Sequence, residues 1–271
     1  MHAALFPHSP ASRYLLLASA AFLGGFINSI AGGGGFVAFP TLLKSGLLPI
    51  EANATTTVAL WPGQFTSIAG YREELRRHLG LVIPVAAVAL IGGVAGAFTL
   101  LHNSQQSFLR LVPYLFLLGS TTFAFSGPVS RAVKRRAQQY DMGQNHEKEH
   151  VLLIPLLIAL LCICYYIGYF GAGAGLLTMT ALAFCGVERI AEINSLKVVT
   201  TTVANGVACI TFIVHAAVAW RDCWFMMIAC AIGGYTGARN SRRVSDKILR
   251  PIIIVFGFSL AIYFFTHRSA F

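Results

Sequence analysis

Apolar residues occur along this chain in long runs that are separated by short polar stretches. Several runs approach the ~20 residues that a helix needs to cross a bilayer. One long polar segment, GPVSRAVKRRAQQYDMGQNHEKEH, separates a first group of runs from a second. The predicted membrane segments are Tyr14–Ile30, Phe36–Leu43, Ala52–Gly70, Leu81–Leu101, Phe108–Phe125, Val151–Phe170, Leu176–Phe184, Ile193–Ala217, Trp224–Ala238 and Pro251–Phe265.

The two groups correspond to each other in detail. IAGGGGFV in the first group and FGAGAGLL in the second lie about 140 positions apart, and each precedes a short apolar run that ends near Gly46 or Gly186. This correspondence predicts an internal repeat. Residues 1–271 then form one membrane domain, with a first repeat at 14–126, a cytoplasmic linker at 127–150 and a second repeat at 151–266.

Basic residues predict the orientation of the chain. YREELRRH, GPVSRAVKRRAQQ and ARNSRRVSDK hold most of the Lys and Arg, whereas LHNSQQSF and HAAVAWRDC hold few. By the positive-inside rule the first three segments lie in the cytoplasm, which places both termini outside and gives the halves opposite orientations. We therefore expect an all-α polytopic membrane protein of two inverted-topology repeats, each with about five membrane segments.

The short run in each repeat leaves the number of spans open. Phe36–Leu43 and Leu176–Phe184 are too short to cross a bilayer, so each is expected to be a half-helix or a re-entrant segment.

Composition agrees with a multi-pass protein of the cell membrane, plasma or inner. The chain is 56% hydrophobic and 11% charged, whereas soluble domains carry roughly 25% charged residues. Positive-inside loops explain the net charge of +10 better than a nucleic-acid partner does. The six cysteines show no metal or disulfide spacing and are expected to be reduced and packed among apolar residues.

Motifs of ATP hydrolysis and of intramembrane proteolysis are absent from the sequence, so we expect neither an enzyme nor a cofactor or metal site.

The glycine-rich breaks are the first candidate binding site. A half-helix that starts after a break presents backbone N–H groups and the positive end of its dipole, which bind anions. Close helix packing is the alternative role of such glycines. The candidate residues at the breaks are Asn28, Ser29, Gly33, Gly34, Gly35, Gly173 and Gly175.

Polar side chains at the start of the following spans are the second candidate. ANATTT and INSLKVVTTTVANG carry hydroxyl and amide groups that either cap helix starts or coordinate a polar substrate. The candidate residues are Asn53, Thr55, Thr56, Gln64, Asn194, Ser195 and Asn205.

Lys197 adds a positive charge to this second group. It follows Asn194 by three positions and therefore lies on the same helical face. Its ammonium group either binds an anionic substrate or reaches out to the cytoplasmic interface. Glu51 and Glu192 are expected to be solvated loop charges, with a role in carrying a coupling proton as the alternative.

Together these motifs resemble the sulfite exporter TauE/SafE family. The likeness rests on IAGGGGFVAFPTLLKSGLLPIEANATTTVAL paired with YIGYFGAGAGLLTMTALAFCGVERIAEINSLKVVTTTVANG and extends over nearly the whole chain. The second copy departs from the pattern, because GAGAG replaces a fuller glycine run and Thr180 aligns with Pro40.

The resemblance implies a secondary transporter, commonly an exporter, of small anions such as sulfite, organosulfonates or carboxylates. Coupling to a proton or sodium gradient and alternating access at the repeat interface would follow. Two alternatives stay open, a passive anion channel and a membrane subunit of a larger complex. The sequence does not specify an oligomeric state.

Overall fold

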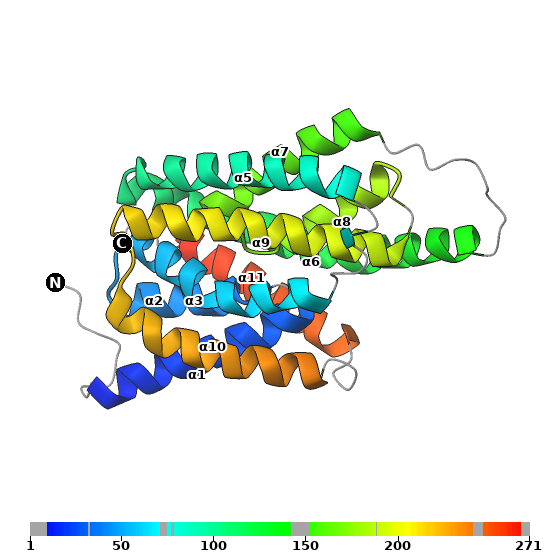
Figure 1. Cartoon of the computed structure of the whole chain (residues 1–271). Coiled ribbons are helices and arrows are strands. Elements are labelled where there is room, and N and C mark those ends of the chain that lie inside the picture. The colour runs from blue at the N-terminus through cyan, green and yellow to red at the C-terminus, as the bar shows by residue number, and fades with distance from the viewer. Residues whose placement is uncertain are drawn as a thin grey trace.

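The computed structural model of the chain describes residues 10–31, 33–70, 75–76, 79–141, 152–187, 189–240 and 246–266. Within these ranges the chain is helical and contains no β-strand. Figure 1 shows the helices running roughly along one common direction. The helices of the first half are α1 (Pro10–Ala31), α2 (Gly35–Lys44), α3 (Pro49–Gly70), α5 (Leu79–Leu101) and α6 (Gln105–Asp141). Those of the second half are α7 (Leu153–Tyr169), α8 (Ala174–Phe184), α9 (Ile190–Val214), α10 (Trp220–Asn240) and α11 (Asp246–Thr266).

The all-helical prediction is confirmed, and each predicted apolar run lies within or overlaps one of these helices. Three described helical segments are long and apolar enough to cross a membrane by length and composition, namely Leu79–Leu101, Gln105–Phe125 and Ala191–Val214. Helix α6 continues beyond Phe125 to Asp141, so it extends into the segment predicted as a linker. Residues 142–150 of that segment lie outside the described residues.

The short helices α2 and α8 end in the same way. Gly46 and Gly186 have φ of +98° and +97°, a left-handed conformation that glycine adopts without steric cost. The amide of Leu47 bonds to the carbonyl of Leu42, five positions back, and the amide of Val187 bonds to that of Leu182. These are the bonds of a Schellman motif, in which the glycine reverses the chain and ends the helix.

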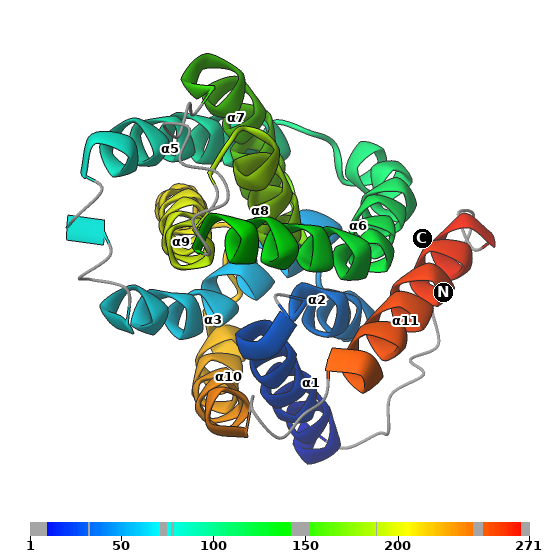
Figure 2. The ribbon, with the colours of Figure 1, turned by 90° about the vertical axis from the view of Figure 1, so that its right-hand side faces the viewer.

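Helices from the two halves pack on each other. The most extensive helix contacts join α1 to α10 and α5 to α7, and α10 also packs on α3 while α5 packs on α9. Figure 2 shows the result: α10 lies beside α1 and α3, α5 lies beside α7 and α9, α9 also packs on α3, and α6 and α11 lie side by side at the edge.

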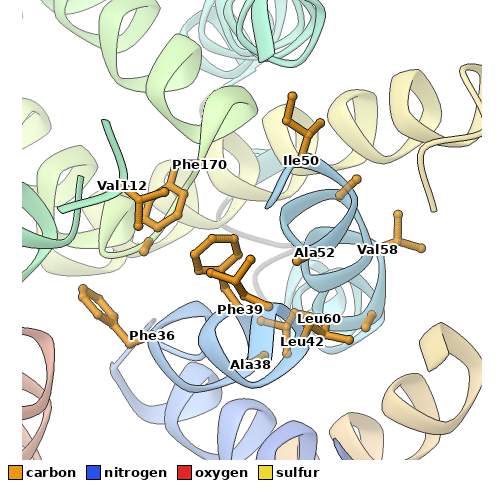
Figure 3. Close-up of a cluster of buried hydrophobic side chains, with 14 of the residues drawn as sticks. Phe36, Ala38, Phe39, Leu42, Ile50, Ala52, Val58, Leu60, Val112 and Phe170 are labelled. Atoms are coloured by element: carbon orange, nitrogen blue, oxygen red, sulfur yellow. The ribbon is translucent and has the colours of Figure 1, made fainter. Parts of the chain in front are cut away.

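Aromatic side chains fill the core around the start of α2. Phe36 lies with its ring centroid 5.4 Å from that of Phe116, and Phe39 lies 5.6 Å from Phe170. Figure 3 shows Phe39 pointing from α2 toward Phe170 and Val112. Many Leu, Ile and Phe side chains on the outer helix faces are exposed, as expected for surfaces that contact lipid.

Candidate functional site

The first break, between α1 and α2, is closely packed. Gly33 and Gly34 are both buried, and a Cβ atom on Gly34 would collide with the carbonyl oxygen of Gly24 in α1. A Cβ atom on Gly33 would lie 3.1 Å from the ring of Phe123. Gly34 therefore allows α1 and α2 to approach closely, and Gly33 makes room for Phe123 of α6, which is the packing role that the sequence left open.

The second break, between α7 and α8, is held by hydrogen bonds. Gly171 and Gly173 have φ of +78° and +79°, so the chain turns there through conformations that side chains disfavour. The hydroxyl of Tyr166 donates to the carbonyl of Ala172 at 2.6 Å. The amide of Gly175, in the first turn of α8, has no acceptor among the described residues.

The two breaks lie against each other. A Cβ atom on Gly35, the first residue of α2, would lie 3.8 Å from the Cβ atom of Ala172. Apart from its chain neighbours and the backbone of α2, no other described atom would come within 4 Å of it. The starts of α2 and α8 are thus neighbours in space, although far apart in the sequence.

A polar stripe on α9 faces the second break. It consists of Asn194, Lys197, Thr201 and Asn205, which follow one another at helical spacing and are all half-buried. The ammonium group of Lys197 lies 3.5 Å from the Asn194 side-chain oxygen. A Cβ atom on Gly175 would lie 3.9 Å from Lys197 Cδ, so the lysine side chain lies beside the start of α8. No carboxylate in the described part of the chain lies within ion-pair distance of this lysine.

The stripe also reaches the other half of the chain. Asn205 Nδ2 donates to Gln64 Oε1 of α3 at 3.0 Å and to the carbonyl of Thr201 at 2.9 Å. A Cβ atom on Gly171 would lie 3.7 Å from Asn205 Oδ1. Asn205 is therefore the residue at which the stripe, the second break and α3 meet.

Other candidates at the starts of α3 and α9 bond to backbone groups. The Asn53 side chain donates to the carbonyl of Tyr169, at the last turn of α7. The Thr55 hydroxyl accepts from the amide of Ala219 and so caps the start of α10. Thr56 and Ser195 are buried and donate to carbonyls of their own helices.

Asn28 and Ser29 differ in what they contact. The Cβ atom of Asn28 lies next to Gly34, at the first break. Ser29 donates to the carbonyl of Phe26, and its hydroxyl lies against Gly237 of α10. The structure thus brings Asn28 to the break and directs Ser29 away from it.

The expectation of a solvated loop charge is wrong for Glu192. Its side chain is only 4% exposed in the first turn of α9. A second buried carboxylate, Asp222 of α10, forms an ion pair with Arg13 of α1 at 2.6 Å. The six cysteines are free thiols, and four of them are buried.

Two residues were not identified from the sequence as parts of this region. Thr201 lies four positions after Lys197 and four before Asn205, so the helical spacing of polar residues was a sufficient signal for it. Tyr166 carries no such signal, because an aromatic residue in an apolar run is ordinarily a packing residue.

Comparison with known proteins identifies the family. The model of the family "Sulfite exporter TauE/SafE" matches residues 17–264. "Probable membrane transporter protein ORF9" of Sinorhizobium sp. is 26% identical over 247 residues, which cover 90% of this chain and 88% of that protein. "Probable membrane transporter protein YfcA" of Escherichia coli K12 is 26% identical and covers 87% of this chain and 83% of its own length. No solved structure matches. The chain therefore belongs to the Sulfite exporter TauE/SafE family and is a multi-pass membrane transporter.

Proposed function

We propose that the transported substrate is a small oxoanion, such as sulfite, an organosulfonate or a carboxylate, and that it binds between the start of α8 and the polar stripe of α9. One observation carries this proposal: Lys197 lies beside Gly175, whose amide is at the positive end of α8. A cation and a helix N-terminus together favour an anion.

The remaining polar groups suit the oxygens of such an anion. Asn194 supplies side-chain amide donors beside Lys197 on α9, whereas Thr201 and Asn205 already donate to protein carbonyl groups and hold the stripe in place. Gln64 supplies an amide from α3. In this proposal Asn28 and Gly35, at the first break, would contact the anion from the other side. Gly33, Gly34, Asn53 and Thr55 would support the site by packing and by hydrogen bonds to backbone groups.

An inverted repeat at 14–126 and 151–266 is part of the proposal. In its support, Figure 1 shows α1 and α7 running in opposite directions, and α2 and α8 end with the same glycine conformation. Trp61 donates to the Thr202 carbonyl and Gln64 accepts from Asn205, each across 141 positions of sequence. Residues related by the repeat would touch each other in this way if they lay on a two-fold axis.

We infer a secondary transporter that exports its anion by alternating access and is coupled to a proton or sodium gradient. Buried Glu192 is the candidate proton carrier in the described part of the second half. Purified protein in liposomes tests this with labelled sulfite. Liposomes preloaded with unlabelled sulfite should take up label faster than empty ones, and an imposed proton or sodium gradient should change the rate. With the membrane potential held at zero by equal potassium on both sides and valinomycin, a passive channel would show neither effect.

Substitution of Lys197 tests the binding site. Lys197→Gln should raise the half-saturating sulfite concentration at least roughly tenfold, because an interaction with a charged group contributes about 1.5–3 kcal/mol. The control is Arg135→Gln, which removes an exposed charge from the part of α6 beyond its apolar segment. Equal sulfite dependence of the two variants would show that Lys197 does not bind the substrate.

A further inference from the structure

The packing of helices divides most of the molecule into two bundles that do not coincide with the two halves of the sequence. We define the first bundle as α1, α2, α3 and α10, and the second as α5, α7, α8 and α9. Each contains three helices of one half and one helix of the other. Figure 2 shows α10 beside α1 and α3, and α5 beside α7 and α9.

Contacts inside each bundle bring helix backbones together without side chains between them. In the first bundle, a Cβ atom on Gly25 of α1 would collide with the carbonyl of Cys230, and one on Gly233 of α10 would collide with that of Phe22. In the second, Gly96 of α5 has the same relation to Tyr165, and Gly168 of α7 to Gly93. Helices that touch at the backbone cannot slide past one another without collision, so α1 with α10 and α5 with α7 each form a stiff pair inside a bundle.

The described ion pair between helices also lies inside a bundle. Arg13 of α1 bonds to Asp222 of α10, and Arg13 and Arg221 both lie 5.7 Å from the ring centroid of Tyr14. This cluster fixes the start of α1 to the start of α10, although these helices come from different halves.

Contacts between the bundles are of a different kind, because at none of the described glycines would a Cβ atom collide with a backbone atom of the other bundle. They run through side chains of α3 against α9, through Phe39 of α2 against Phe170, and through Gly35 beside Ala172. Trp61 Nε1 donates to the Thr202 carbonyl at 3.1 Å, and the Trp61 ring lies against Gly206 of α9. Gln64 accepts from Asn205. Side chains can change rotamer and exchange partners, so this contact can turn while the backbone contacts hold.

We propose that the two bundles, and not the two halves of the chain, are the bodies that move during transport, and that they turn about the contact of α3 with α9. The inference rests on the proposed alternating-access function. The anion site would then open and close because α8 and α9 belong to the second bundle, whereas Gln64 and Gly35 belong to the first.

Distances between spin labels separate the two assignments of moving bodies. Single cysteines replace four exposed residues, Leu23 of α1, Leu90 of α5, Ile158 of α7 and Ile228 of α10. The background carries Cys162→Ala and Cys185→Ala, because these two native thiols are not buried. Four pairs of nitroxide labels are measured in lipid nanodiscs, with and without sulfite, by continuous-wave electron paramagnetic resonance for the short distances between touching helices and by pulsed electron paramagnetic resonance for the longer ones.

Two pairs lie within a bundle but join different halves, Leu23 with Ile228 and Leu90 with Ile158. The other two lie within a half but join different bundles, Leu23 with Leu90 and Ile158 with Ile228. Each labelled position occurs once in each class, so the mobility of the labels affects both classes equally. We expect narrow, unchanged distances within bundles, and broader distributions between bundles that shift with sulfite.

The opposite pattern would overturn the proposal, and so would equally narrow distributions in both classes. The result does not depend on the identity of the substrate, because the widths are also compared without any added anion. If liposomes transport no sulfite while the between-bundle distances are broad, the proposed substrate is wrong but the assignment of the moving bodies is supported. If sulfite is transported and the within-bundle distances are the broad ones, only the bundle assignment fails.

Discussion

Two adjacent glycines at the first break, Gly34 and Gly35, differ in how closely their surroundings are packed. Gly34 has ordinary helical dihedral angles, φ −59° and ψ −32°, yet a side chain there would collide with the Gly24 carbonyl. Gly35 has space for a methyl group, with Ala172 as its nearest neighbour. The conformation of Gly34 is open to any residue, so the requirement for glycine comes from the neighbouring helix.

Alanine at each position should therefore have opposite effects on stability. Gly34→Ala should lower the free energy of unfolding by about 1–3 kcal/mol, because the packed backbone of α1 must shift. Gly35→Ala should leave stability unchanged or raise it by up to about 1 kcal/mol, since alanine restricts the unfolded chain. Thermal unfolding in detergent compares the two variants. A lower midpoint for Gly35→Ala than for Gly34→Ala would contradict the packing described here.

At this scale the sequence predicts part of the site. The spacing of Asn194, Lys197 and Asn205 was enough to put them near one helical face, and the structure places them there. Spacing was insufficient for Ser29, because a residue next to Asn28 lies about 100° further round the helix and meets α10 instead. Which face of α1 meets which helix depends on contacts distant in sequence.

The connection between α7 and α8 departs from helical geometry. It leaves helical geometry at Phe170 and resumes it at Ala174. The Tyr166 hydroxyl satisfies the buried carbonyl of Ala172, and the Asn53 side chain satisfies that of Tyr169. A break in hydrocarbon needs such partners, because an unsatisfied carbonyl there costs several kcal/mol.

Removing the Tyr166 hydroxyl should destabilise this connection. Tyr166→Phe keeps the ring and leaves the Ala172 carbonyl without its donor, which should cost about 1–3 kcal/mol of unfolding free energy. The matched control is Tyr165→Phe, one position earlier on the exposed face of α7. Both variants are compared by thermal unfolding. Equal midpoints would show that the hydroxyl does not stabilise the break.

Hydropathy predicted the helices well where they lie in lipid and poorly where they leave it. The glycine breaks and the short α2 and α8 follow from composition, since four glycines in a row do not sustain a helix. Helix α6 was underestimated, because apolar character stops at Phe125 while good helix formers in RAVKRRAQQYD continue the helix.

At the scale of the whole molecule, α5 of the first half packs on α7 and α9, and α10 of the second half packs on α1 and α3. This exchange of helices between the halves was not predictable from the sequence. Apolar runs show which residues lie in the membrane but contain no information about which helix each run contacts. Positions 96 and 233 require glycine because the backbones of α7 and α1 approach them closely, and only the structure shows this approach.

The exchange makes each half depend on the other for folding. If the chain is divided between Asp141 and Leu152 and both fragments are expressed together, they should associate and purify as one complex. The fragment 1–141 expressed alone should aggregate or be degraded, because α5 then lacks its main partner α7. Size-exclusion chromatography measures both results. A soluble, monodisperse fragment 1–141 in detergent would contradict the exchanged packing.

The pairing of Gln64 with Asn205 also restricts which residue types suit this place in the molecule. If the repeat is inverted, Gln64 and Asn205 are counterparts that face each other. Two identical halves would therefore place the same side chain on both sides of the contact. A lysine would meet a lysine and an aspartate an aspartate, and both would repel. A carboxamide carries a donor and an acceptor at once, so it is complementary to a copy of itself. If the repeat is inverted, this self-complementary chemistry would explain why each half carries an amide here, glutamine in one and asparagine in the other.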